Sequence, residues 1–161
     1  MQLSKTRTVR TMKTTPKLKS FLIVETILFI IGGFIYAGIE IGLRGFTHWS
    51  MFIVGGLCFV IIGLLNEWYS WDIPLFLQML YGAFVITALE LISGYILNIK
   101  LGWNIWDYSD RPFNFYGQIC LLNSCLWFLL SGIGILLDDV IRNIWFDGEE
   151  PRYKIFGKVF K

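Results

Sequence analysis

Two acidic residues interrupt long apolar stretches of this 161-residue chain. Glu40 lies in the segment IYAGIEI and Glu90 lies in VITALEL, so aliphatic residues surround each carboxylate. A charged side chain at the centre of a membrane-spanning helix costs roughly 2.5–3.5 kcal/mol on insertion scales, and such groups usually face a bundle interior or water. The pair therefore predicts a proton- or cation-binding site. The alternative is that Arg44, His48 or helix–helix hydrogen bonds simply satisfy both carboxyls.

The segment between residues 101 and 118 interleaves aromatic and polar residues, which favours a folded cap over a flexible linker. Aromatic walls with a few polar groups are typical of small-ligand sites. We expect a polar pocket that opens on the outer side of the membrane, with this segment as its lid. The candidate ligand-binding residues are Glu40, Glu90, Trp103, Trp106, Asp107, Tyr108, Arg111 and Asn114.

Other kinds of chemistry find little support in the sequence. The motifs G-x-x-x-x-G-K-[ST], H-E-x-x-H and G-x-S-x-G do not occur, so neither a P-loop nor a common hydrolase or zinc-protease signature is present. The three cysteines form no C-x-x-C pair, and the single His48 is too little for a catalytic triad or a zinc centre. We therefore predict no metal and no cofactor, and we assign no catalytic residue.

A second group of polar residues is expected at the cytoplasmic face. We interpret it as a boundary where helix ends meet water, with Arg142 balancing the acidic pair one turn before it. Glu25 is interpreted in the same way, because it lies near the basic N-terminal residues. The members of this group are Asn66, Glu67, Asp72, Asp138, Asp139 and Arg142.

The elements that must position these residues are membrane helices. Of the chain, 55% is hydrophobic and 16% is charged, and this much apolar surface excludes an ordinary soluble enzyme or nucleic-acid binder. A helix needs about 20 apolar residues to cross the bilayer. Four runs meet or approach that length, at residues 21–43, 48–65, 73–99 and 112–137, and the first residues of the fourth run look more like loop than helix. The predicted fold is an all-α integral membrane protein, a four-transmembrane-helix bundle with an ordered third, extracytoplasmic loop.

Basic residues predict how the bundle is oriented. Eleven of the 14 Lys and Arg residues fall in the two tails, and three fall on the opposite side, so both termini are expected to be cytoplasmic. The domains are then a basic cytoplasmic tail (1–20), a transmembrane domain (21–137) and a cytoplasmic amphipathic tail (138–161). The expected partner of the N-terminal tail is anionic lipid rather than nucleic acid.

The chain also contains a weak internal similarity. Glu40 and Glu90 occupy similar positions in the first and third runs, so two helical hairpins of the same orientation could be a parallel duplication. The spacing Gly38-x-x-x-Gly42 permits close packing of the first helix, within one chain or between two copies.

The third loop also resembles a known family. The sequence GWNIWDYSDRPFN at 102–114, followed by GQICL at 117–121, is similar to the signature of the bacterial putative ABC-transporter type IV (CmpB-like) membrane proteins. HWSMF at 48–52 and the surroundings of Glu90 are similar too, and the resemblance extends over residues 31–142. It implies a small polytopic protein of the bacterial plasma membrane, and it brings no established substrate or catalytic residue.

Three functions remain open at this point. The first is a transport-related, permease-like protein that binds a small solute in the outward pocket through Glu40 and Glu90. The second is an accessory or scaffolding subunit without chemistry, which would form a homo-oligomer or join other membrane subunits. The third is a membrane enzyme that uses carboxyl groups such as Asp107 for acid–base chemistry on an isoprenoid-like lipid.

Overall fold

The computed structural model describes residues 18–69 and 71–160. Its helices are α1 (Leu18–Arg44), α2 (Trp49–Trp68), α3 (Leu75–Gly94) and α4 (Leu121–Phe146), and α3 continues as a π-helical segment, η1 (Tyr95–Lys100). All four are long and apolar enough to cross a membrane. The predicted all-α bundle of four membrane helices is therefore confirmed.

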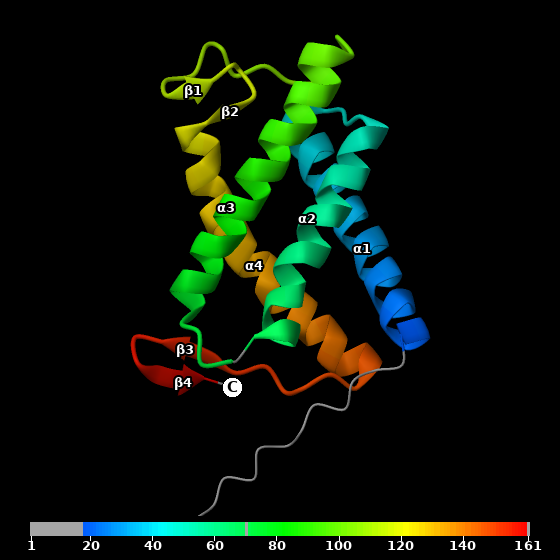
Figure 1. Cartoon of the computed structure of the whole chain (residues 1–161), viewed down its shortest axis with the longest axis vertical. Helices are drawn as coiled ribbons and strands as arrows, with labels where there is room; N and C mark the ends of the chain where they lie inside the picture. The colour runs from blue at the N-terminus through cyan, green and yellow to red at the C-terminus, as the bar shows by residue number, and fades with distance from the viewer. Residues whose placement is uncertain (1–17, 70, 161) are drawn as a thin grey trace, which may run out of the picture.

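Two short hairpins mark opposite ends of the bundle (Figure 1). Strands β1 (Asn114–Phe115) and β2 (Ile119–Cys120) pair between η1 and α4. Strands β3 (Tyr153–Ile155) and β4 (Lys158–Phe160) pair after α4. We call the end that carries β1–β2 and the α1–α2 connection the loop end. The tail end carries β3–β4, the α2–α3 connection and the start of α1.

The fourth helix lies further along the chain than the sequence predicts. Residues 112–120 are not helical, because Phe113, Tyr116 and Gly117 adopt left-handed backbone conformations that turn the chain into the β1–β2 hairpin. The helix continues nine residues beyond Leu137 and ends where Asp147 turns left-handed (φ 53°). The expected boundary between residues 137 and 138 therefore falls inside α4, and the last part of the expected tail segment forms the β3–β4 hairpin.

Helices α1 and α2 pack through glycines that face aromatic side chains of the other helix. Gly32 lies against Phe59 and Gly55 lies against Tyr36, so each helix contributes both a small and a large partner. Gly56 is close to the backbone itself, because a methyl group added there would lie 2.6 Å from the Phe29 carbonyl oxygen. Such contacts allow the close helix approach that small residues permit in membranes. Helices α3 and α4 form the second pair, with the Ser131 hydroxyl donating to the Met79 carbonyl at 2.9 Å.

We expect Gly56→Ala to lower the free energy of unfolding by about 1–3 kcal/mol, since the added methyl group must push two backbones apart. Denaturation with sodium dodecyl sulphate in mixed micelles would measure the loss. The matched control is Gly38→Ala on α1, where no atom lies within 4 Å of the new methyl group. Equal losses of unfolding free energy in the two variants would show that the close α1–α2 contact at Gly56 is not the cause of the loss.

Candidate functional site

The structure gives Glu40 and Glu90 separate sets of partners. At the end of α1, Glu40 pairs with Arg44, at 2.6 Å between Oε1 and Nη2, and accepts a hydrogen bond from the Thr47 hydroxyl. Arg44 also donates to the Ile105 carbonyl at 3.1 Å, which ties α1 to the third loop. Glu40 is therefore neutralised by a neighbouring guanidinium, as the simpler interpretation of this residue expected.

Glu90 lies in α3 and is 5% exposed. Its Oε1 accepts a hydrogen bond from the Tyr108 hydroxyl at 3.1 Å, and its Oε2 accepts one from the Trp127 indole at 2.9 Å. Both donors are neutral. In residues 18–69 and 71–160, Glu90 forms no ion pair with a Lys, Arg or His side chain. A buried carboxyl between neutral donors is poorly compensated when charged, so a proton or a bound cation would complete the site.

Of the predicted loop residues, Tyr108 forms a direct hydrogen bond with Glu90 in the described part of the chain. Burial raises the pKa of the Tyr108 phenol, and the nearby Glu90 carboxylate raises it further. The hydroxyl therefore remains protonated and serves Glu90 as a hydrogen-bond donor. Because the Tyr108 backbone N–H also donates to the Gly117 carbonyl at 2.8 Å, the fold of the loop fixes the position of this donor.

Trp106 belongs to the buried framework of the loop. Its indole donates to the Gln118 carbonyl at 3.0 Å, and its own carbonyl accepts from the Asn98 amide at 3.0 Å. Asn98 also donates to Oε1 of Gln118 at 2.9 Å and accepts from the Ile105 backbone at 2.7 Å. The side chain of Asn98, at the end of η1, thus holds both ends of the loop.

We expect Asn98→Leu to loosen the third loop, because three buried groups lose their partner at roughly 1–3 kcal/mol for each one left unsatisfied. Chymotrypsin cleavage at the aromatic residues of the loop should become at least tenfold faster. Lys100→Leu, on the exposed side of the same segment, is the control. Similar cleavage rates in Asn98→Leu and the parent protein would contradict this role.

The remaining predicted loop residues lie away from Glu90 or shape the loop itself. Asp107 is exposed, and hydrogen bonds from the hydroxyl and backbone N–H of Ser109 lower its pKa, which favours a form that cannot act as a general acid. Arg111 is exposed beside Asp110, at 3.8 Å. Asn114 donates to the Arg111 and Ser109 carbonyls. The structure therefore does not gather the eight predicted residues into one pocket.

Trp103 stacks in a different place, at the start of α2. Its ring centroid lies 5.2 Å from that of His48 and 5.8 Å from that of Trp49. His48 in turn caps α2 by accepting from the Ser50 backbone N–H at 3.3 Å. This aromatic cluster joins the two connections at the loop end and explains why the single histidine sits there.

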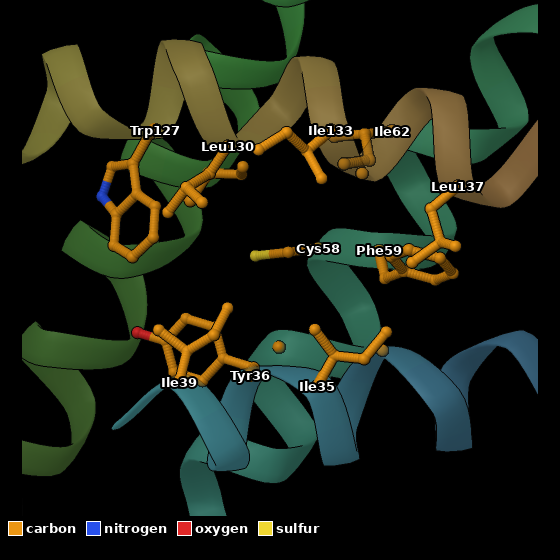
Figure 2. Close-up of a pocket in the computed structure, with 14 residues that line it drawn as sticks. Ile35, Tyr36, Ile39, Cys58, Phe59, Ile62, Trp127, Leu130, Ile133 and Leu137 are labelled. Carbon is orange, nitrogen blue, oxygen red and sulfur yellow. The ribbon is translucent and has the colours of Figure 1, made fainter. Parts of the chain in front are cut away.

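A cavity of about 110 Å³ lies between α1, α2 and α4, with Ile86 of α3 also in its lining, and it was not predicted from the sequence. Figure 2 shows Tyr36 on α1 and Trp127 on α4 near one end, with the Cys58 sulfur of α2 pointing into the space between the helices. The lining is almost entirely apolar. Because Trp127 both lines the cavity and donates to Glu90, it connects the two features. The signal available in the sequence was its position in the middle of the fourth apolar run.

The tail end holds a buried network of charges, which corrects the boundary interpretation of Glu25. Arg142 on α4 donates to both carboxylate oxygens of Glu25 on α1, at 2.7 and 2.9 Å, and to Asp138 at 2.6 Å. Asp139 accepts from the Asn66 amide at 2.7 Å and from the Tyr153 hydroxyl at 2.8 Å. These bonds join α1, α2, α4 and β3, and they explain why α4 stays helical past Leu137.

The acidic pair in this network has no geometry typical of a metal site. Among the described residues, no group of three or more His, Cys, Asp or Glu side chains is arranged to hold a metal ion. Asp138 is fully buried and lies directly against Gly63 of α2. The network therefore acts as a clamp between helices.

Comparison with known proteins supports the membrane assignment. The family described as putative ABC-transporter type IV matches residues 20–150, which include all four helices and the third loop. No curated protein and no solved structure matches the chain. With its four candidate membrane spans, the chain is a multi-pass membrane protein that belongs to the putative ABC-transporter type IV family.

Proposed function

We propose that this protein is a transport-related membrane component in which Glu90 binds a proton and exchanges it for a cationic solute. One observation carries the proposal: Glu90 is 5% exposed, and within the described residues its carboxyl group receives hydrogen bonds from the neutral donors Tyr108 and Trp127 and forms no ion pair. Ionisable residues inside membrane spans commonly mark proton relays and ion or substrate pathways. The family to which the chain belongs supports a connection with transport.

The surroundings of Glu90 suit such an exchange. A cation that replaces the proton restores electrical neutrality, and the aromatic rings of Tyr108 and Trp127 offer it polarisable faces. The third loop covers the site from the loop end, so movement of Tyr108 would open or close access to the carboxyl. Glu40 has no part in this exchange, because Arg44 already neutralises it.

Proteoliposomes with a trapped pH-sensitive dye would test the proposal. With the membrane potential clamped by potassium and valinomycin, external sodium, lithium and quaternary alkylammonium salts are added in turn. We expect at least one cation to drive protons out of the lumen. Glu90→Gln should reduce this flux at least tenfold, because glutamine keeps the shape of the side chain and removes its exchangeable charge.

Glu150→Gln, which makes the same chemical change at an exposed position in the tail, is the matched control. Its proton flux should equal that of the parent protein. The proposal fails if none of the cations moves protons through the parent protein, or if Glu90→Gln retains the parent's rate.

We also propose that both tails lie on the cytoplasmic side of the plasma membrane. Ten of the 14 basic residues lie near the two ends of the chain: six precede Ser20, and four follow the end of α4 at Phe146. Basic residues of this kind set membrane orientation and attract anionic lipid. The N-terminal tail lies mostly outside the described residues, so this proposal rests on its composition. A cysteine introduced at Ser4 should react with an impermeant maleimide only after the cells are opened.

A second candidate function, as a subunit of a membrane assembly, is favoured by the outer face of α1. Gly38 and Gly42 have no atom within 4 Å of an added methyl group, so the described part of the chain does not use this pair for its own packing. A second copy would fit that face closely. Disulfide cross-linking of Gly42→Cys in membranes, against exposed Ile23→Cys as control, would detect it, and equal cross-linking of both would reject it.

A further inference from the structure

We propose that the cation recognised at Glu90 is an amphipathic organic cation whose apolar part lies in the cavity between α1, α2 and α4. This inference rests on the proposed function of Glu90 and adds a substrate class to it. A short alkyl chain would enter the cavity, and a quaternary or protonated amine would face the carboxyl.

The cavity opens sideways, toward the surrounding bilayer. Two of its lining residues are exposed on the outside of the bundle, Ile35 of α1 (38%) and Ile133 of α4 (62%). The floor is formed by α2, with Cys58 at its centre (Figure 2). All three helices lie within candidate membrane spans. An entrance at this depth admits a molecule dissolved in lipid, so the occupant must have an apolar portion.

Contacts between α1 and α4 bound the cavity at both ends. At the tail end, Arg142 bridges to Glu25. Toward the loop end, the rings of Tyr36 and Trp127 lie 6.0 Å apart, and the Trp127 indole bonds to Glu90. A molecule that lies along the cavity therefore has a charged network at one end and an aromatic pair beside a carboxyl at the other.

The charges around Glu90 determine whether a cationic or an anionic head group can bind at that end of the cavity. The groups that act on Glu90 or share its field are Tyr36 and Glu40 from α1, Cys58 from α2, Tyr108 from the loop and Trp127 from α4. None of these groups carries a positive charge, and the guanidinium of Arg44 is paired with Glu40. By contrast, Arg142 at the tail end is already paired with two carboxylates. A cationic head is complementary to the Glu90 end, and an anionic head is repelled there.

Aromatic rings strengthen the same selection. Attraction between a cation and an aromatic face contributes about 0.5–1 kcal/mol at exposed sites and about 2 kcal/mol or more when the pair is desolvated. Tyr36, Tyr108 and Trp127 all lie at this end of the cavity or on Glu90 itself. The volume of about 110 Å³ is somewhat below that of an apolar cavity of roughly 150 Å³ that holds benzene. The portion of the ligand inside the cavity is therefore short.

Binding of three related probes to the protein in neutral phosphatidylcholine nanodiscs would test the inference. Hexyltrimethylammonium has both a cationic head group and a hexyl chain. Tetramethylammonium has only the cationic group, and hexanesulfonate has the hexyl chain with an anionic head group. We expect hexyltrimethylammonium to bind at least tenfold more tightly than tetramethylammonium, after subtraction of binding to empty nanodiscs. Hexanesulfonate should show no binding above that background.

Substitutions at the entrance of the cavity then show where the alkyl chain of the probe lies. Ile133→Phe narrows the cavity from an exposed position and should lower the binding affinity for hexyltrimethylammonium at least tenfold. Leu129→Phe, one turn away on α4 and equally exposed to lipid, should leave the affinity unchanged. If Ile133→Phe disturbs folding, covalent labelling of Cys58 by N-ethylmaleimide gives the same information, because a bound chain should slow it relative to exposed Cys125.

The outcomes separate this inference from the function on which it depends. Equal affinities for hexyl- and tetramethylammonium, both lost in Glu90→Gln, would overturn the role of the cavity and leave the cation site at Glu90 standing. Binding of hexyltrimethylammonium that Ile133→Phe removes and Glu90→Gln does not would overturn the inference and the proposed function together. Binding of hexanesulfonate as tight as that of the cation would overturn the selection by charge.

Discussion

Replacing Arg142 by methionine is expected to lower the free energy of unfolding by about 3–5 kcal/mol, the usual cost of breaking a buried ion pair by removing one partner. The guanidinium is 7% exposed and donates to Glu25 and Asp138, which are both largely buried. Methionine fills a similar volume and leaves both carboxyls without a counter-charge. The bridge between α1 and α4 at the tail end is lost at the same time.

Denaturation in mixed micelles would measure this loss, with Arg152→Met as the matched control. Arg152 makes a long, half-exposed contact with Glu149 at 3.8 Å, so its loss should cost less than about 1 kcal/mol. The triple variant Glu25→Leu, Asp138→Leu, Arg142→Met should recover much of the stability, because an apolar replacement leaves no buried charge uncompensated. A small loss in Arg142→Met, similar to that in Arg152→Met, would contradict the clamp.

The second large effect is expected at the cation site. Glu90→Gln should weaken binding of a quaternary ammonium ion by about 2–5 kcal/mol, the range found when one partner of a buried charge pair is removed. The amide oxygen of glutamine can still accept the hydrogen bond from Trp127 or Tyr108, so the bundle should stay folded. Titration calorimetry of the protein in nanodiscs would measure the affinity.

Glu40→Gln provides the contrast for this measurement. Its carboxylate is paired with Arg44, so its replacement should reduce stability and leave the affinity for the cation nearly unchanged. Equal losses of affinity in the two variants would indicate that both carboxylates form one site. Unchanged affinity for the cation in both variants would indicate that neither carboxylate binds it.

Much of the fold could be predicted from the sequence, because the length and composition of apolar runs determine membrane helices. The fourth run misled the prediction in a physically clear way. Phe113, Phe115 and Tyr116 extend the apolar run, yet all three side chains are exposed in a turned hairpin. Pro112 and Gly117 indicate a turn here, in agreement with the folded cap expected over residues 101–118, which overlaps the start of this run.

The candidate site was predicted only in part. Glu90 stood out because a carboxylate in an apolar helix is costly, and Tyr108 was included because of its place in an aromatic loop. Trp127 lies in the middle of the fourth apolar run and was not assigned to the site. Nothing in the local sequence indicates that Glu25 meets Arg142, which lies 117 residues away, since helix pairing decides that contact.

The cavity could not be predicted for the same reason. Its walls come from α1, α2 and α4, with one residue from α3, and its existence depends on how far α1 and α4 are held apart. The two contacts that set this distance, Tyr36 with Trp127 and Glu25 with Arg142, are tertiary. Composition predicted that these helices are apolar, which is equally true with and without a space between them.

Proton release on cation binding tests the central claim most directly. The protein in nanodiscs, in weakly buffered solution at acidic pH, is saturated with hexyltrimethylammonium or tetramethylammonium while a pH-sensitive dye records the protons set free. We expect the parent protein to release protons, the release to diminish as the starting pH is raised, and Glu90→Gln to release none. Cation binding without proton release at any starting pH, or the same release from Glu90→Gln, would contradict the assignment of Glu90 as the exchanging group.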